Sequence, residues 1–141
     1  MWEGYLSESK IADCAYEAWE FGASPDELAS LVKRGIKTAT SSAYDLYAKD
    51  SEALPKVGEY SVILSSKGEA VCIIKTVKVE VIKYCDVTED FALKEGEGDR
   101  TLAYWRRVHE DFFKKELRAE GLEFSPEMKV VCEQFKLVFP K

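Results

Sequence analysis

The stretch YSVILSSKGEAVCIIKTVKVEVIKY, residues 60–84, decides the fold class. Its first run, Tyr60–Leu64, is short and apolar, and the SSKGE that follows is typical of a hairpin turn. The run that starts at Ala70 is rich in β-branched residues, and from Lys75 onward polar and apolar side chains alternate. The stretch therefore predicts a β-hairpin whose second arm is one or two strands with a bend and one buried face.

Helical patterns surround this hairpin. Apolar spacing predicts a helix over residues 8–20, and Ser24, Pro25 and Glu27 form a capping-box pattern for a second helix that stops at Gly35. The remaining expected elements are short helices at 44–49 and at the start of 86–99, a long helix over about 100–119 capped by Asp99 or Thr101, and a closing strand over 130–139. This order favours an α+β fold with a mostly antiparallel, barrel-like sheet and flanking helices.

Length and charge narrow the class of protein. The 141 residues predict one domain, and 46% hydrophobic residues suffice for one core. The net charge of −6 argues against broad binding to duplex nucleic acid, because phosphate neutralisation dominates that affinity. A pocket for a single nucleotide stays compatible with this composition.

The cysteines, the single histidine and the N-terminus indicate which metal sites and which cellular compartment to expect. Cys14, Cys72 and Cys132 lie in apolar runs and are expected to be buried free thiols, and Cys85 forms no CxxC with any of them. A zinc site is disfavoured, since only His109 is available beside widely spaced cysteines. The chain has no signal-peptide pattern and no long apolar run, which predicts a cytoplasmic protein without membrane contact.

The first candidate site is Lys37-Thr38-Ala39-Thr40-Ser41-Ser42, which follows a predicted helix. One cation and four hydroxyls can bind an oxyanion, a desolvated Lys37 could act as a base, and a neighbouring Thr could be a nucleophile. The alternative interpretation is a polar loop whose hydroxyls bond to the turn backbone.

Two further segments carry charge. Glu95-Gly96-Glu97-Gly98-Asp99 could hold a metal or supply a general acid or base, or it could be a solvated loop that ends in a helix cap. The basic residues of the long helix predict either a phosphate-contacting patch or a solvated face with ion pairs such as Glu110–Lys114 and Arg107–Asp111. These basic residues are Arg106, Arg107, Lys114, Lys115 and Arg118, with Arg100 just before the helix.

Aromatic residues and His109 complete the candidates. His109 lies on the apolar side of the long helix and is expected to be structural. The aromatic side chains that could stack on a base are Trp19, Phe21, Tyr44, Tyr47 and Tyr104, of which Tyr44 and Tyr47 are favoured because they follow the Lys37 segment. P-loop, GxSxG, HExxH and GxGxxG patterns are absent from the sequence, and one histidine disfavours a conventional triad hydrolase.

Taken together, several segments resemble the ASCH family of the PUA-like superfamily, and the similarity is closest to small bacterial stand-alone members. It extends over nearly the whole chain after residue 20 and leaves 1–20 as a helical extension. The matching segments are FGASPDELASLVKRGIKTATSS (21–42), LPKVGEYSVILSSKGEAVCIIKTVKVEVI (54–82), EDFALKEGEGDRTLAYWRRVHEDFF (89–113) and FSPEMKVVCEQFKLV (124–138).

The resemblance implies a PUA-like β-barrel with a cleft beside the G-x-K-T segment and one of two activities, hydrolysis of N4-acetylcytidine to cytidine and acetate or cleavage of single-stranded RNA. The implied catalytic residues are Lys37, Thr40 and Glu95, with Glu97 as a rival for the acid. In this scheme a neutral Lys37 takes the Thr40 proton, Thr40 attacks the acetyl carbonyl, and Glu95 holds the exocyclic nitrogen or passes it a proton. Neither a metal nor another cofactor is implied.

The residues expected to contact the substrate are Thr38, Ser41, Ser42, Tyr44, Glu97, Arg100 and Arg106. The expected partner is a nucleoside or single-stranded RNA, and the acidic net charge favours the smaller ligand. Two non-enzymatic alternatives stay open, an RNA- or nucleotide-binding module and a protein-interaction domain of the coactivator type. The oligomeric state is left open as well.

Overall fold

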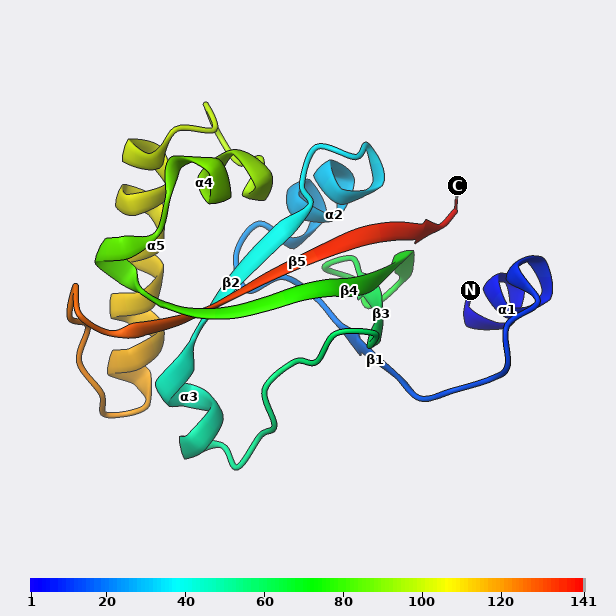
Figure 1. Cartoon of the computed structure of the whole chain (residues 1–141), viewed down its shortest axis with the longest axis horizontal. Coiled ribbons are helices and arrows are strands. Elements are labelled where there is room, and N and C mark those ends of the chain that lie inside the picture. Colours follow the sequence, from blue (N-terminus) through cyan, green and yellow to red (C-terminus); the bar gives the residue numbers. More distant parts are fainter. Residues whose placement is uncertain (141) are drawn as a thin grey trace.

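The predicted hairpin lies inside a five-stranded sheet in the computed structural model, which describes residues 1–140 (Figure 1). The strand order is β1-β3-β4-β5-β2, and every neighbouring pair is antiparallel except β1 and β3, which are parallel. The elements in chain order are α1 (Trp2–Ser9), β1 (Tyr16–Trp19), α2 (Pro25–Lys33), β2 (Ala39–Ala43), α3 (Tyr44–Lys49), β3 (Tyr60–Leu64), β4 (Ala70–Lys83), a 3-10 turn (Tyr84–Asp86), α4 (Glu89–Glu95), α5 (Leu102–Ala119) and β5 (Lys129–Phe139).

The second arm of the hairpin is one bent strand, as its sequence allowed, but the alternating part does not bury a valine face, because Val77 and Val81 are exposed and Thr76 is buried. Along its pairing with β5, the register of β4 shifts between Ile73 and Ile74 and again between Thr76 and Lys78. Such irregularities bend a strand and increase its twist. The long β4–β5 pair therefore curves, and the sheet curls with it (Figure 1).

The fold is α+β, as expected. The sheet is not closed into a barrel, so the expectation of a barrel is wrong. The edge strands β1 and β2 have four and five residues, and they pair with β3 and β5 rather than with each other. Residues of both edge strands line one cleft, described below. The gap between them is thus an opening into the curled sheet.

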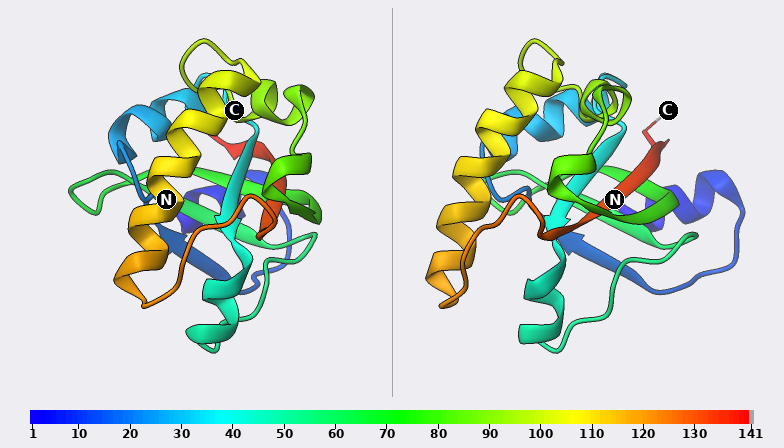
Figure 2. Two further views of the ribbon diagram at one scale, coloured as in Figure 1. Left: turned by 90° about the vertical axis from the view of Figure 1, so that its left-hand side faces the viewer. Right: turned by 60° about the vertical axis from the view of Figure 1, so that its left-hand side comes forward.

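The helix expected over 8–20 is also wrong. The helix α1 ends at Ser9, where Lys10 adopts a left-handed conformation, and Tyr16–Trp19 form β1. The spacing of apolar residues predicted a helix here, but Tyr16–Trp19 form a strand because they pair in parallel with Tyr60–Ile63. This tertiary contact is not encoded in the local sequence. Aromatic packing of Trp2 on Tyr16 and Tyr60 holds α1 at the end of the sheet remote from α5 (Figures 1 and 2).

Helix caps follow the sequence in part. Thr101 caps α5 and Thr88 caps α4, each by accepting a backbone N–H. Ser24, however, has a left-handed conformation and its side chain makes no cap, so the expected capping box at α2 does not form. Asp26 instead accepts hydrogen bonds from the backbone and hydroxyl of Ser66 and ties α2 to the hairpin turn.

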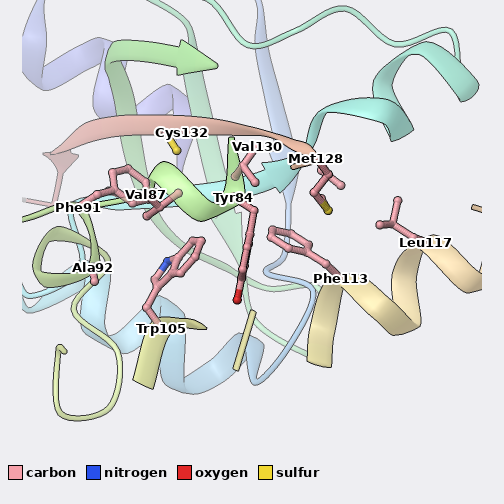
Figure 3. Packing of buried hydrophobic residues seen from close by; sticks show 12 residues of the cluster. Tyr84, Val87, Phe91, Ala92, Trp105, Phe113, Leu117, Met128, Val130 and Cys132 are labelled. Carbon is pink, nitrogen blue, oxygen red and sulfur yellow. The ribbon is translucent and has the colours of Figure 1, made fainter. Parts of the chain in front are cut away.

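Two hydrophobic cores flank the beginning of β2. One lies between α5, β2 and β5, where Tyr84, Trp105 and Phe113 pack together (Figure 3). The other lies between α2 and strands β3, β4 and β5, around Phe21 and Val32. The first core includes Ala39 and Ala43 of β2, and Phe21 of the second core lies under the ammonium of Lys37.

Cysteine burial differs from expectation at one position. Cys72 and Cys132 are buried free thiols, as predicted, whereas Cys14 is exposed in the connection before β1. Burial raises the pKa of Cys72 to about 11 and that of Cys132 to about 12, so both are protonated at neutral pH.

Within residues 1–140, the helices are too short or too polar for any of them to cross a bilayer.

The core between α5 and the sheet should dominate stability. Phe113 is completely buried, so Phe113→Ala should lower the free energy of unfolding by about 3–5 kcal/mol. Phe124 is only partly buried against the same core, and Phe124→Ala is the matched control with a smaller loss. Equal losses in urea titrations of the two variants would contradict this assignment of the core.

Candidate active site

The part of the Lys37 segment from Ala39 onward forms the edge strand β2 rather than a loop, and Lys37 and Thr38 lie just before it. Its residues pair with β5 in antiparallel register, with Ala39 opposite Gln134 and Ala43 opposite Val130. Ala39 and Ala43 are buried against α5, and strand alternation places Ser41 on their face. Thr40 and Ser42 consequently point to the opposite face.

Lys37 is buried between two carboxylates, with a relative exposure of 1%. Its Nζ donates to Oε1 of Glu95 at 2.9 Å and to Oε2 of Glu97 at 2.8 Å. A third, longer contact of 3.5 Å reaches the backbone carbonyl of Glu95. All three ammonium hydrogens therefore have acceptors from the end of α4 and the loop that follows.

Glu95, at the end of α4, is equally buried and faces donors from β2 and α5. Its Oε2 accepts from the Ser41 hydroxyl at 2.7 Å and from the indole N–H of Trp105, and it lies 3.4 Å from Nε2 of His109. These contacts join β2, α4 and α5 at one carboxylate. We name the set Lys37, Glu95, Glu97, Trp105 and His109 the ion cluster.

His109 is a structural member of the ion cluster, in line with the sequence. Its Nδ1 lies 2.9 Å from the carbonyl oxygen of Trp105, and its Nε2 faces Glu95. Because both partners are acceptors, the ring satisfies them only when both nitrogens carry protons. Its stacking on the Trp105 indole, with ring centres 4.3 Å apart, also favours the cationic ring.

The pKa directions agree with this charge arrangement. Burial opposes every charge, yet Glu95 and Glu97 raise the pKa of Lys37, and Glu95 raises that of His109. Against its own burial, Lys37 and His109 hold the pKa of Glu95 well below its usual range. For Glu97, burial and the neighbouring Glu95 outweigh Lys37, and its pKa is raised. Lys37 therefore rests as an ammonium, so the neutral Lys37 base of the family scheme does not describe this state.

A metal ion fits this arrangement poorly. Glu95, Glu97 and His109 each offer one ligand atom within 4.8 Å of the others. The ammonium of Lys37 is already bonded to both carboxylates and thus takes the place of a cation. His109, moreover, faces Glu95 as a donor rather than as a free lone pair.

A cleft of about 750 Å³ opens on the other side of this cluster. It receives residues from all five strands, including Thr40–Ser42 of β2 and Glu17–Trp19 of β1. Phe21 and Ser41 form part of its wall, and the Lys37 Nζ lies 5.3 Å from the centre of the Phe21 ring. The ion cluster thus lies behind the wall of the cleft.

The cleft is acidic and aromatic. It has a single basic lining residue, the exposed Lys56, within the part of the chain that the structure describes. Its carboxylates are Glu17, Glu20, Glu52, Glu59, Glu116 and Glu133, and its aromatic residues are Trp19, Phe21, Tyr47, Tyr60 and Phe112. Such a lining repels phosphate groups and offers flat apolar surfaces.

The three residues implied as catalytic do not form one hydrogen-bonded group within residues 1–140. Lys37 and Glu95 form the buried ion pair, with Glu97 as its second carboxylate. Thr40 lines the cleft, and in residues 1–140 its hydroxyl bonds to neither of them. Ser41, which lines the cleft and donates to Glu95, is the direct link between the two groups.

The residues expected to contact substrate divide similarly. Ser42 lines the cleft, where its hydroxyl lies 2.7 Å from that of Tyr47. Thr38 donates to the carbonyl of Lys94 and fastens β2 to α4. Three others lie outside the cleft lining: Tyr44 under Lys129, the exposed Arg100, and the exposed Arg106.

The basic face of α5 is a solvated face. Glu110 pairs with Lys114 at 3.0 Å, as predicted. Asp111 pairs with Lys115 rather than with Arg107, whose guanidinium lies over the ring of Tyr104.

Most of the lining of the acidic cleft was not predicted from the sequence, and Glu133 and Thr76 are two such residues. Glu133 and Thr76 line the cleft from β5 and β4, and they are bonded to each other at 2.7 Å. A charged residue within the apolar run VVCEQF was a visible signal for Glu133. Thr76 carried no such signal, because alternation placed it among exposed residues of β4.

The curled mixed sheet, its covering helices and the cleft at β2 define an α+β domain of the PUA-like type. The family model described as the ASCH domain matches residues 17–139, and the chain belongs to this family. The resemblance seen in the sequence is thereby confirmed.

Two solved structures are similar over most of the chain. The ASCH domain from Lactobacillus crispatus JV V101 is 34% identical with a TM-score of 0.87, and the match covers 97% of this chain and 91% of that one. Protein EF3133 from Enterococcus faecalis V583 is 37% identical with a TM-score of 0.88, covering 98% and 87%. The hypothetical protein PH0355, at 16% identity, a TM-score of 0.59 and coverage of 87% and 99%, shares the fold alone. No curated protein matches the chain.

The turn between the two carboxylates should tolerate no side chain. Gly96 has φ of +70°, and a Cβ there would collide with the carbonyl of Ile36, next to Lys37. Gly68 has φ of +77° with open space around it, so Gly68→Ala is a control for backbone strain alone. We expect Gly96→Ala to lower the free energy of unfolding by about 1–3 kcal/mol more than Gly68→Ala. Equal effects in urea titrations would contradict the close packing of this turn on Ile36.

The buried carboxylate should make stability depend on pH. The pKa of Glu95 lies below its usual value of 4.5, so its charge stabilises the fold above that pH and the stabilisation is lost as the pH falls. Removing this partner of a buried charge should cost about 3–5 kcal/mol near neutral pH. Glu95→Gln should therefore be much less stable than the wild type near neutral pH, and the difference should shrink in acid. Glu80→Gln, at an exposed position of β4, is the control; a difference for Glu95→Gln that does not change with pH would contradict the assignment.

Proposed function

We propose that this protein hydrolyses an acylated nucleoside such as N4-acetylcytidine, with Thr40 as the nucleophile. The observation that carries the proposal is the position of Thr40 on an edge strand, facing a cleft of small-molecule size, with a buried ion cluster behind it. Membership of the ASCH family supports the general class, and the substrate is the part proposed here.

The shape of the cleft suits one nucleoside. Its volume of about 750 Å³ lies within the range of small-ligand sites, and Trp19 and Tyr47 offer flat faces on which a base could stack. Its hydroxyls, from Thr40, Ser41 and Ser42, lie along one strand and can bind a sugar or an acyl group. Within residues 1–140, β2 pairs with a strand on one side only, so backbone N–H groups on its other side could stabilise a developing oxyanion.

The charge of the cleft favours a nucleoside over RNA. Six lining glutamates against one lysine would repel successive phosphates, and this argues against the ribonuclease and RNA-binding alternatives at this site. A nucleoside with no phosphate avoids that repulsion. The same nucleoside with a 5′-phosphate should accordingly be a poorer substrate, chiefly through a higher KM.

The ion cluster supports the nucleophile from behind. Ser41 is held by Glu95, and Glu95 is held by Lys37, so the cluster fixes the strand position next to Thr40. The ammonium of Lys37 also partly offsets the negative potential of the cleft wall. In this proposal Glu95 acts through Ser41 and not by direct contact with the exocyclic nitrogen.

The proposal predicts cytidine and acetate from N4-acetylcytidine in the presence of the purified protein, followed by chromatography. Thr40→Ala should lower kcat/KM by at least about 100-fold, because it removes the atom that attacks. Ser30→Ala, an exposed hydroxyl of α2, is the control and should retain the wild-type rate. Wild-type protein that forms no cytidine, or a fully active Thr40→Ala variant, would refute it; steeply salt-dependent binding of single-stranded RNA would instead favour the binding-module alternative.

A further inference from the structure

Glu133 is the cross-strand neighbour of Thr40. The antiparallel register of β2 and β5 places these two residues directly opposite each other. Side chains of directly opposed residues lie on the same face of a sheet, with Cβ atoms about 4.5–5.5 Å apart. Both residues also line the cleft. The carboxyl of Glu133 is therefore within reach of the Thr40 hydroxyl by side-chain rotation.

One oxygen of Glu133 is held in place and the other is available. Its Oε2 accepts a hydrogen bond of 2.7 Å from the Thr76 hydroxyl. In residues 1–140, no lysine, arginine or histidine forms an ion pair with this half-buried carboxyl. Oε1 thus has no hydrogen-bond donor in the described protein and can accept one from Thr40.

The charged and titratable groups around Glu133 come from several elements of the cleft, and apart from Lys56 they are acids or phenols. They are Glu17 of β1, Glu59 before β3, Tyr60 of β3, Tyr47 of α3, Glu52 and Lys56 of the loop after α3, and Glu116 of α5. Burial first, and then the charges of Glu59 and Glu17, raise the pKa of Glu133 against the lowering effect of Thr76. A carboxyl shifted in this direction accepts and returns a proton more readily near neutral pH.

Lys37 cannot take this role in its resting state, since its three N–H groups point to Glu95 and Glu97 and its ammonium has no free lone pair. We infer that Glu133 is the catalytic residue that accepts the Thr40 proton and delivers it to the leaving group, with Thr76 as its positioning residue. This inference rests on the proposed acyl transfer to Thr40, and it adds a residue from β5 to the site.

The proposed reaction has an acylation half and a deacylation half. The Oγ of Thr40 forms a bond to the acyl carbon while its proton moves to the Glu133 carboxylate, and the carbonyl pair moves to oxygen. The tetrahedral species then re-forms its carbonyl and breaks the C–N bond, and the departing amine takes the proton from Glu133. In the second half, water attacks the Thr40 ester and gives its proton to Glu133. The threonine oxygen leaves and recovers a proton, and the carboxylic acid is released.

A test that does not need the natural substrate uses p-nitrophenyl acetate. Acetylation of the intact protein is followed by mass spectrometry, with peptide mapping to locate the acetyl group and Thr40→Ala to confirm the site. The wild type should be acetylated at Thr40 at a rate that rises with pH as Glu133 ionises. Glu133→Gln should be acetylated at Thr40 about 100-fold more slowly and lose that pH-dependent rise.

Two variants separate this role from a structural one. Glu133→Asp keeps a carboxylate and should retain the pH-dependent rise at a reduced rate, whereas Glu80→Gln should match the wild type. Folding of each variant is checked by thermal melting. Acetylation of Thr40 at the wild-type rate in Glu133→Gln, or a folded Glu133→Asp that has lost the pH-dependent rise, would overturn the inference.

The outcomes also distinguish this inference from the proposed function. Thr40 acetylated through Glu133, with no hydrolysis of N4-acetylcytidine, would support the inference and refute the proposed substrate. A wild-type protein in which the ester leaves Thr40 unmodified would overturn the inference itself, even if N4-acetylcytidine were hydrolysed by another group.

Discussion

The burial of the Lys37 ammonium between Glu95 and Glu97 is the constraint on which the rest of the structure depends. A buried cation is tolerated only when its hydrogens are all accepted, and here the acceptors come from the end of α4 and its following turn. Glu95 in turn accepts hydrogen bonds from Ser41 of β2 and Trp105 of α5, and it faces His109 of α5. One charge pair therefore fixes an edge strand relative to two helices, and breaking it would leave an uncompensated charge in the core.

This constraint explains why the cleft can remain open. In a closed barrel every strand has a partner on each side, whereas β2 is an edge strand held by β5 on one side and by the ion cluster behind it. Its other edge is free to face the space near β1, and the cleft occupies this opening. The residues that hold the fold together and the residues that line the cleft thus belong to the same short strand, and Ser41 does both.

The sequence predicted the regular parts of this architecture well, because local patterns determine them. The hairpin, α3, α5 with its Thr101 cap and the closing strand were all visible in spacing and turn chemistry. The strand β1 was not, since it is fixed by a parallel pairing with β3 that no local pattern encodes. At the site, the motif led to Lys37, Thr40 and the two glutamates, but Lys37 lies before β2 and bonds to the buried carboxylates, whereas Thr40 lines the cleft. The charge of Glu133 in an apolar run was visible in the sequence, but its position opposite Thr40 was not, because that register depends on a contact between distant segments.

The most direct test of this account is the ionisation state of Lys37 itself. Nitrogen-15 NMR of the lysine Nζ groups would distinguish a buried ammonium from a neutral amine, with the signal of Lys37 assigned by its loss in Lys37→Met. The account predicts an ammonium signal with slowly exchanging hydrogens that persists above the usual lysine pKa of 10.5, because Glu95 and Glu97 raise the pKa of this group against its burial. A neutral amine at neutral pH, or hydrogens that exchange as fast as those of exposed lysines, would contradict it.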